Sequence, residues 1–155
     1  MHIALKYGLL TTSVLIVWVS LTRFIFPIDA GSSLNLLAPV LFNLAAILFI
    51  FLGIRQRTRE GGGTLSFKDG LKTGVGISAV YGATASLFFL FLMLMVGPEF
   101  MSNESLAADR PFWQAALLAY SGLFFGALFL GLVYSAVISF GLALQRRSSL
   151  RQDKS

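Results

Sequence analysis

Four apolar runs, each long enough to cross a bilayer as a helix, restrict the fold of this chain more than any other feature. The runs cover residues 7–26, 34–54, 75–96 and 115–144. An α-helix rises about 1.5 Å per residue, so roughly 20 residues span a hydrocarbon core of ~30 Å. We therefore predict an all-α fold, a four-helix transmembrane bundle that forms a single integral membrane domain over residues 1–155.

The composition excludes a water-soluble domain. Hydrophobic residues make up 56% of the 155 residues and charged residues only 12%, whereas a soluble domain has about 25% charged residues. A chain of this length cannot bury so much apolar surface in its own core. The net charge of +5 does not indicate a nucleic-acid partner, because the basic residues lie between the apolar runs and are explained by membrane orientation.

The distribution of basic residues predicts the orientation. Ten of them fall on one side of the four runs and two, Arg23 and Arg110, on the other. The ten are Lys6, Arg55, Arg57, Arg59, Lys68, Lys72, Arg146, Arg147, Arg151 and Lys154. The positive-inside rule places both termini in the cytoplasm, with an up-down-up-down topology.

The first run has an alternative interpretation as a cleavable signal peptide. Lys6 would supply a weak basic region, and residues 28–30 (Ile-Asp-Ala) a poor cleavage site. The run is long for a signal peptide, and residues 23–27 are bulky where small residues are needed. We favour a retained span.

The segments that follow the second and fourth spans carry most of the basic residues. We predict that these segments are polar and lie in the cytoplasm. Residues 55–65 form a flexible linker with three consecutive glycines, and residues 146–155 a polar tail. Ser66 and Asp69 form a variant of the capping box, which marks the start of the third helix. Its first turns are amphipathic and are expected at the membrane interface. Candidate contacts to lipid headgroups are Arg55, Arg57, Arg59, Lys68 and Lys72.

Small residues recur at every fourth position along the third helix, which places them on one helix face. They are Gly70, Gly74, Ser78, Gly82 and Ser86, and the fourth run offers Gly122 and Gly126 as its contribution to a helix-packing face, with further small residues at Gly131, Ser135 and Ser139. Such faces let helix backbones approach closely in membranes. We expect the two faces to pack within one subunit, and packing between two copies is the alternative.

Asn43 is the polar side chain predicted to lie deepest in the membrane. An amide in this setting most often makes a hydrogen bond between helices. A contact to a substrate is the alternative.

The sequence offers no catalytic or metal-binding cluster. His2 is the one histidine, there is no cysteine, and the acidic residues lie in loops or at the interface. Nucleophilic catalysis and metal binding both need such groups brought together. We expect no enzyme activity and no cofactor.

Spans one and three begin alike, with residues 4–8 (Ala-Leu-Lys-Tyr-Gly) and 70–74 (Gly-Leu-Lys-Thr-Gly). An internal duplication of two parallel hairpins is one interpretation, and the shared topology of any two membrane hairpins is the other.

The motifs at residues 5–8 (Leu-Lys-Tyr-Gly), 65–74 (Leu-Ser-Phe-Lys-Asp-Gly-Leu-Lys-Thr-Gly) and 97–101 (Gly-Pro-Glu-Phe-Met) resemble those of the domain-of-unknown-function 4199 family. The polar segment between spans three and four is shorter here than is usual in that family. The resemblance implies a small, multi-pass protein of the bacterial inner membrane and implies no catalytic residues.

Three function classes remain compatible with the sequence. The favoured one is an accessory or interaction protein with close helix packing, whose partners are the lipid bilayer and either a second copy or another membrane protein. The alternatives are a small oligomeric transporter or channel subunit and a protein that associates with anionic lipid.

Overall fold

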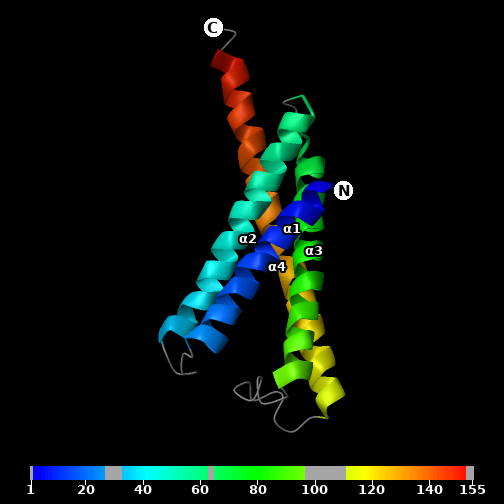
Figure 1. Ribbon diagram of the computed structural model, residues 1–155. Helices are drawn as coiled ribbons and strands as arrows, with labels where there is room; N and C mark the ends of the chain where they lie inside the picture. Colours follow the sequence, from blue (N-terminus) through cyan, green and yellow to red (C-terminus); the bar gives the residue numbers. More distant parts are fainter. Residues whose placement is uncertain (1, 27–32, 63–64, 97–110, 153–155) are drawn as a thin grey trace.

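The computed structural model describes residues 2–26, 33–62, 65–96 and 111–152 and is all-α (Figure 1). Its elements are α1 (His2–Ser20), the π-helical segment η1 (Leu21–Ile25), α2 (Ser33–Glu60), α3 (Phe67–Val96) and α4 (Phe112–Gln152). Each of the four α-helices contains a stretch long and apolar enough to cross a membrane. The prediction of an all-α protein with four membrane-spanning helices is confirmed. Residues 27–32 and 97–110 between the predicted spans, residues 63–64 of the predicted linker and residues 153–155 of the predicted tail lie outside the described residues.

Helix α3 is the central element. It contacts α1, α2 and α4, and its contact with α4 is the most extensive in the described part of the chain. In its most apolar window 39% of the residues are buried, against 17% in α2 and in α4. The α1–α2 hairpin crosses the α3–α4 hairpin, and the two diverge toward the end where α1 stops and α2 begins (Figure 1).

The small residues of α3 pack against small residues of α4 in an antiparallel register. The pairs are Gly70 with Ser139, Gly74 with Ser135, Ser78 with Gly131, and Gly82 with Ala127. A methyl group at Gly74 would lie 2.6 Å from Ser135 Cβ, and one at Gly82 would lie 3.1 Å from Ala127 Cβ. We call these four pairs the small-residue seam. The two backbones approach this closely because no side chain larger than serine lies between them.

Helix α1 packs beside α3 in a parallel register. Gly8 faces Val80, where an added methyl group would lie 2.6 Å from Val80 Cβ. One turn further, the hydroxyls of Thr12 and Thr84 share a hydrogen bond of 2.5 Å. Beyond this bond, Leu15 and Val19 join residues of α3 in a buried apolar cluster. Glycine and hydroxyl contacts therefore bring α1 against α3 as well.

Helix α2 continues beyond Ile54, where the second span was expected to end. Residues 55–60 are helical, so the prediction of a flexible linker is wrong for this part of 55–65. Arginine, glutamine and glutamate are good helix formers, and Gln56 Nε2 donates to Glu60 Oε1 at 2.8 Å. The helix ends where Gly62 adopts a positive φ of 70°.

Helix α4 is likewise longer than expected. It begins at Phe112 and runs to Gln152, beyond the predicted end of the fourth span at residue 144. The predicted polar tail is therefore helical as far as Gln152. Its C-terminal turns extend beyond the other helices (Figure 1).

The start of α3 follows its capping residues. The Asp69 N–H donates to Ser66 Oγ at 3.4 Å, and the Gly70 N–H donates to the Ser66 carbonyl at 3.1 Å. Ser66 thus satisfies backbone donors of the first turn, as the sequence predicts.

Candidate functional site

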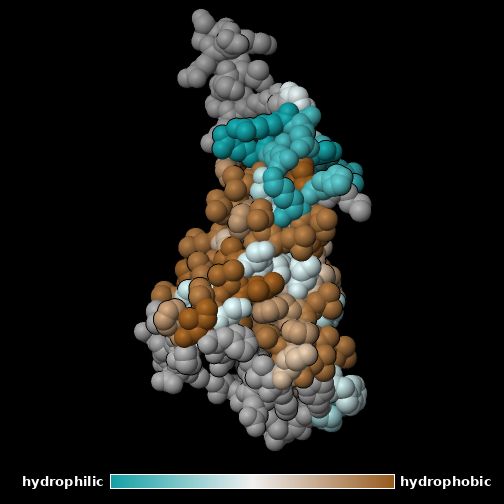
Figure 2. Space-filling model, viewed as in Figure 1, coloured by the Kyte–Doolittle hydropathy of each residue, from teal (hydrophilic) through white to brown (hydrophobic). Residues whose placement is uncertain are grey.

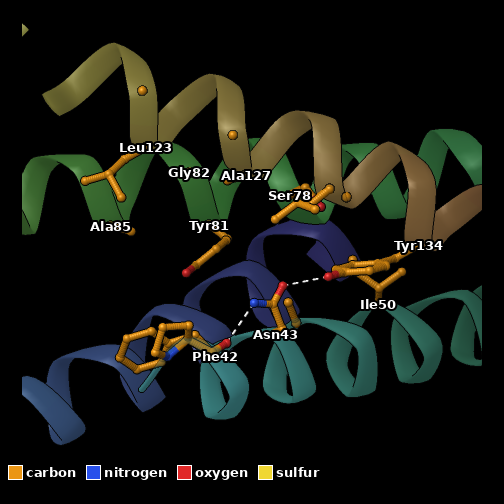
Figure 3. A pocket seen from close by; sticks show the side chains of 16 residues that line it. Phe42, Asn43, Ile50, Ser78, Tyr81, Gly82, Ala85, Leu123, Ala127 and Tyr134 are labelled. Carbon is orange, nitrogen blue, oxygen red and sulfur yellow. Dashed lines mark hydrogen bonds between the residues drawn. The ribbon is translucent and has the colours of Figure 1, made fainter. Parts of the chain in front are cut away.

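A cleft of about 300 Å³ lies between α2, α3 and α4 (Figure 3). We call it the lateral cleft. It is lined by Pro39, Phe42, Asn43, Ala46 and Ile50 of α2, by Ser78, Tyr81, Gly82 and Ala85 of α3, and by Gly122, Leu123, Gly126, Ala127, Leu130, Gly131 and Tyr134 of α4. All three segments lie within the parts of their helices that are long and apolar enough to cross a membrane. The cleft therefore lies between the predicted membrane-spanning parts of the helices.

Glycines open the α4 wall of the lateral cleft. A methyl group at Gly122 or at Gly126 would meet no other atom within 4 Å. Gly82 and Gly131 lie where α3 meets α4 and add no side chain to the space. The absence of side chains at these positions contributes to the open space of the cleft.

A polar pair bridges the cleft between α2 and α4. Tyr134 Oη donates to Asn43 Oδ1 at 2.6 Å, and Asn43 Nδ2 donates to the Pro39 carbonyl at 2.7 Å. Figure 3 shows the Asn43 and Tyr134 side chains pointing toward one another. The second bond holds the amide in one orientation, so that its oxygen faces α4. Asn43, predicted to make a polar contact between helices, makes one to Tyr134.

The lining of the lateral cleft is mostly apolar. It holds no carboxylate, histidine, lysine or arginine, and its polar side chains are Asn43, Ser78, Tyr81 and Tyr134. Within the described ranges, no three metal-ligating residues come together. The cleft therefore offers an apolar wall with a few amide and hydroxyl groups, of which Asn43 and Tyr134 are hydrogen-bonded to one another.

The predicted packing face divides into two parts in the structure. The five α3 residues lie against α4: four belong to the small-residue seam, and Ser86 Oγ donates to the Tyr120 carbonyl at 3.3 Å. Gly122 and Gly126 do not meet α3 and instead line the lateral cleft. The register places Ala127 against Gly82, and a shift of one residue turns a helix position by about 100°.

The predicted headgroup contacts gather at one end of the bundle. Arg55, Arg57 and Arg59 are exposed at the end of α2, and Lys68 and Lys72 at the start of α3. Lys6 of α1 lies at the same end, since it lines a pocket with Arg57. We call this the basic end. Figure 2 shows hydrophilic residues over this end and apolar surface next to it.

Sequence reasoning missed the partners of several residues. It did not predict the hydrogen bond of Tyr134 to Asn43 or that of Thr12 to Thr84. Nor did it place Lys6 and Arg57 in one pocket. The small-residue seam, in contrast, has a signal in the sequence. From Ser139 back to Ala127, every fourth residue of α4 is small. This spacing matches that of the small residues of α3 from Gly70 to Gly82. The tyrosine and threonine partners carry no such periodicity.

The chain was compared with known families and structures. A family model described as protein of unknown function (DUF4199) matches residues 6–143. No curated protein and no solved structure matches the chain.

Proposed function

The chain belongs to the DUF4199 family. We propose that it is a multi-pass inner-membrane protein that acts by binding a lipid chain in the lateral cleft, not as an enzyme. The chain itself has four helices suited to crossing a membrane. The sequence predicts an accessory role, and this proposal adds a lipid chain as the ligand.

The proposed topology is up-down-up-down with the basic end and both termini in the cytoplasm. Six basic side chains supporting this are exposed at that end: Lys6, Arg55, Arg57, Arg59, Lys68 and Lys72. Cytoplasmic loops carry an excess of lysine and arginine. Phe67 is 46% exposed beside Lys68, which supports an amphipathic start of α3 at the interface.

The cleft volume is the observation that supports a hydrocarbon chain as ligand. At about 300 Å³ the lateral cleft is roughly twice the size of an apolar cavity of ~150 Å³ that holds one benzene. A recess of this size with a mostly apolar lining can accommodate an alkyl or prenyl chain.

The polar residues of the bundle give no support to transport. Thr12, Ser78, Ser86 and Ser135 are buried in contacts between helices or in bonds to backbone carbonyls. A permeation path would instead need polar groups along a shared, open stripe. Lipid binding remains the function that the site supports best.

Photolabelling in a membrane tests this proposal. The full chain is reconstituted in vesicles that contain a phospholipid with a photoactivatable diazirine on one acyl chain, and the labelled residues are mapped by mass spectrometry. We expect Ala46, Leu123 and Gly126 to be labelled several-fold more than Phe129 and Val137, which are 68% and 67% exposed.

A matched pair of variants separates the cleft from the general lipid surface. Gly126→Phe fills the lateral cleft and should abolish the preference, whereas Gly141→Phe, also at an open glycine but outside the cleft, should keep it. Equal labelling of cleft and surface residues in the unmodified chain would contradict the proposal.

A further inference from the structure

A second pocket, distinct from the lateral cleft, lies between α1 and α2 at the basic end. Its volume is about 510 Å³, and its lining includes Leu5, Lys6 and Leu9 of α1 and Gln56, Arg57 and Glu60 of α2. We call it the α1–α2 pocket. None of these residues lines the lateral cleft.

The charged side chains of this pocket sum to one positive charge. Lys6 and Arg57 are cationic and Glu60 is anionic, and His2 also belongs to the lining. Glu60 accepts a hydrogen bond from Gln56 Nε2 at 2.8 Å, and Lys6 Nζ lies 5.2 Å from the centroid of the Tyr7 ring. Among the described residues neither cation forms an ion pair. A group with a single negative charge, such as a phosphodiester, complements this set.

A chain of hydrogen bonds links α1 to α2 next to the α1–α2 pocket. Tyr7 Oη donates to Gln56 Oε1 at 2.9 Å, and Gln56 Nε2 donates to Glu60 Oε1. Gln56 and Glu60 line the pocket, so these bonds restrain two of its side chains. Lys6 and Arg57 are exposed and line the same pocket, so both can turn toward one ligand. Arginine can bind a phosphate with two parallel hydrogen bonds, and lysine acts as a point charge.

The apolar side of the pocket indicates where the rest of such a ligand would lie. Leu5 and Leu9 are 51% and 44% exposed and lie one turn apart on α1. Leu9 lies toward the membrane from Lys6, since α1 enters the apolar layer from the basic end. A molecule whose phosphate contacts Lys6 and Arg57 would thus place its apolar part over leucine, as an interfacial phospholipid does.

From these observations we propose that the α1–α2 pocket is a binding site for the headgroup of an anionic phospholipid, with Lys6 and Arg57 holding the phosphodiester and Leu5 and Leu9 contacting the acyl chains. The site stands apart from the proposed lipid chain in the lateral cleft. It shares helix α2 with the cleft, but it depends on α1 in place of α3 and α4, on other side chains and on a polar part of the lipid.

Native mass spectrometry of the purified full chain tests the proposal. The protein is exposed to equal amounts of phosphatidylglycerol and phosphatidylethanolamine, and the bound lipid adducts are counted. We expect phosphatidylglycerol to be retained about tenfold more than phosphatidylethanolamine. Lys6→Gln combined with Arg57→Gln should reduce retained phosphatidylglycerol at least fivefold.

The control variant carries the same change in charge outside the pocket. Arg55→Gln combined with Lys72→Gln removes two exposed cations that the sequence also predicts as headgroup contacts but that do not line the pocket. If the pocket rather than the whole basic end selects the headgroup, this variant should retain at least half of the phosphatidylglycerol. An equal loss in both variants, or no headgroup preference in the unmodified chain, would overturn the proposal because it would show general charge attraction only.

Three further measurements complete the test. Glycerol phosphate at millimolar concentration should not displace the bound lipid, and displacement at that level would show a site for a soluble phosphate. Arg57→Lys keeps the charge but lacks the planar guanidinium, so it should retain an intermediate amount of phosphatidylglycerol. Retention equal to that of the unmodified chain would exclude a bidentate role for Arg57.

Gly126→Phe fills the lateral cleft and should remove a lipid bound there whatever its headgroup, so it should leave the preference for phosphatidylglycerol over phosphatidylethanolamine unchanged. Loss of the preference in Lys6→Gln with Arg57→Gln but not in Gly126→Phe distinguishes the α1–α2 pocket from the cleft.

Discussion

Ser135 of α4 lies directly against Gly74 of α3, and its hydroxyl donates to the Gly131 carbonyl of its own helix at 2.5 Å. The next pair along the seam has the reverse order, with Ser78 of α3 against Gly131 of α4. In both pairs a serine occupies the space that the opposite glycine leaves. Each pair therefore needs one glycine, but either helix can provide it.

This relationship predicts that Gly74 tolerates no larger side chain. Gly74→Leu should lower the free energy of unfolding by about 1–3 kcal/mol because the added atoms overlap with Ser135, and the melting temperature in detergent should fall by about 5 °C. Gly141→Leu, at an exposed glycine with no atom within 4 Å, is the control and should melt as the unmodified chain does.

An exchange of the pair tests the packing more directly. Gly74→Ser alone should destabilise the protein, and addition of Ser135→Gly should recover most of the loss, because the Ser78–Gly131 pair already shows that the reverse order fits. A double-mutant cycle by thermal unfolding should give a coupling of at least ~0.5 kcal/mol. Strict additivity would show that the two residues do not share the contact.

The register also predicts a specific crosslink. The sequence contains no cysteine, so Gly82→Cys with Ala127→Cys supplies the two thiols. They should oxidise to a disulfide within one chain, since the added Cβ at Gly82 would lie 3.1 Å from Ala127 Cβ. Gly82→Cys with Gly126→Cys should crosslink less, because Gly126 faces the cleft. A dimer band on a non-reducing gel as the main product would instead favour packing between subunits.

The bond between Asn43 and Tyr134 should make a modest contribution to stability. Tyr134→Phe removes the hydroxyl that donates to Asn43 and should cost about 0.6–2 kcal/mol, the range for hydrogen bonds between membrane helices. Thermal unfolding in detergent measures the change. Tyr120→Phe, on the same helix but outside the lateral cleft, is the matched control, and an equal effect of the two changes would argue against a special role for Asn43.

Removal of the Ser139 hydroxyl should not lower the stability, in contrast to removal of the Tyr134 hydroxyl. Its Oγ is buried and makes no hydrogen bond, the one such case among the described side chains. Because an unsatisfied buried hydroxyl costs about 1–3 kcal/mol, Ser139→Ala should leave the melting temperature unchanged or raise it. Ser135→Ala, which loses the bond to the Gly131 carbonyl, should not raise it.

Single-cysteine labelling checks the proposed orientation. Arg59→Cys at the basic end should react with a membrane-impermeant maleimide only after the membrane is opened, whereas Glu104→Cys should react in intact spheroplasts. Reaction of Arg59→Cys in intact spheroplasts would contradict a cytoplasmic basic end.

The sequence predicts much of the fold, for identifiable reasons. Apolar runs determine which segments become spanning helices, because a bilayer accepts only segments whose backbone bonds are satisfied internally. The helix limits were less accurate: residues 55–60 and 146–152 are polar yet helical, since their residues favour helix and hydropathy does not report on helix formation in water. At the site, the sequence identified Asn43 and the α3 half of the seam.

By itself, then, the sequence determined the number of helices, their membrane character and the presence of a face of small residues on α3. The tertiary structure decided which residues meet that face, because the register of α4 depends on how two complete helix surfaces fit together. That register turns Gly82 toward Ala127 and leaves Gly122 and Gly126 open to the lateral cleft. Spacing along one helix shows which residues share a face, but only packing shows which face is covered.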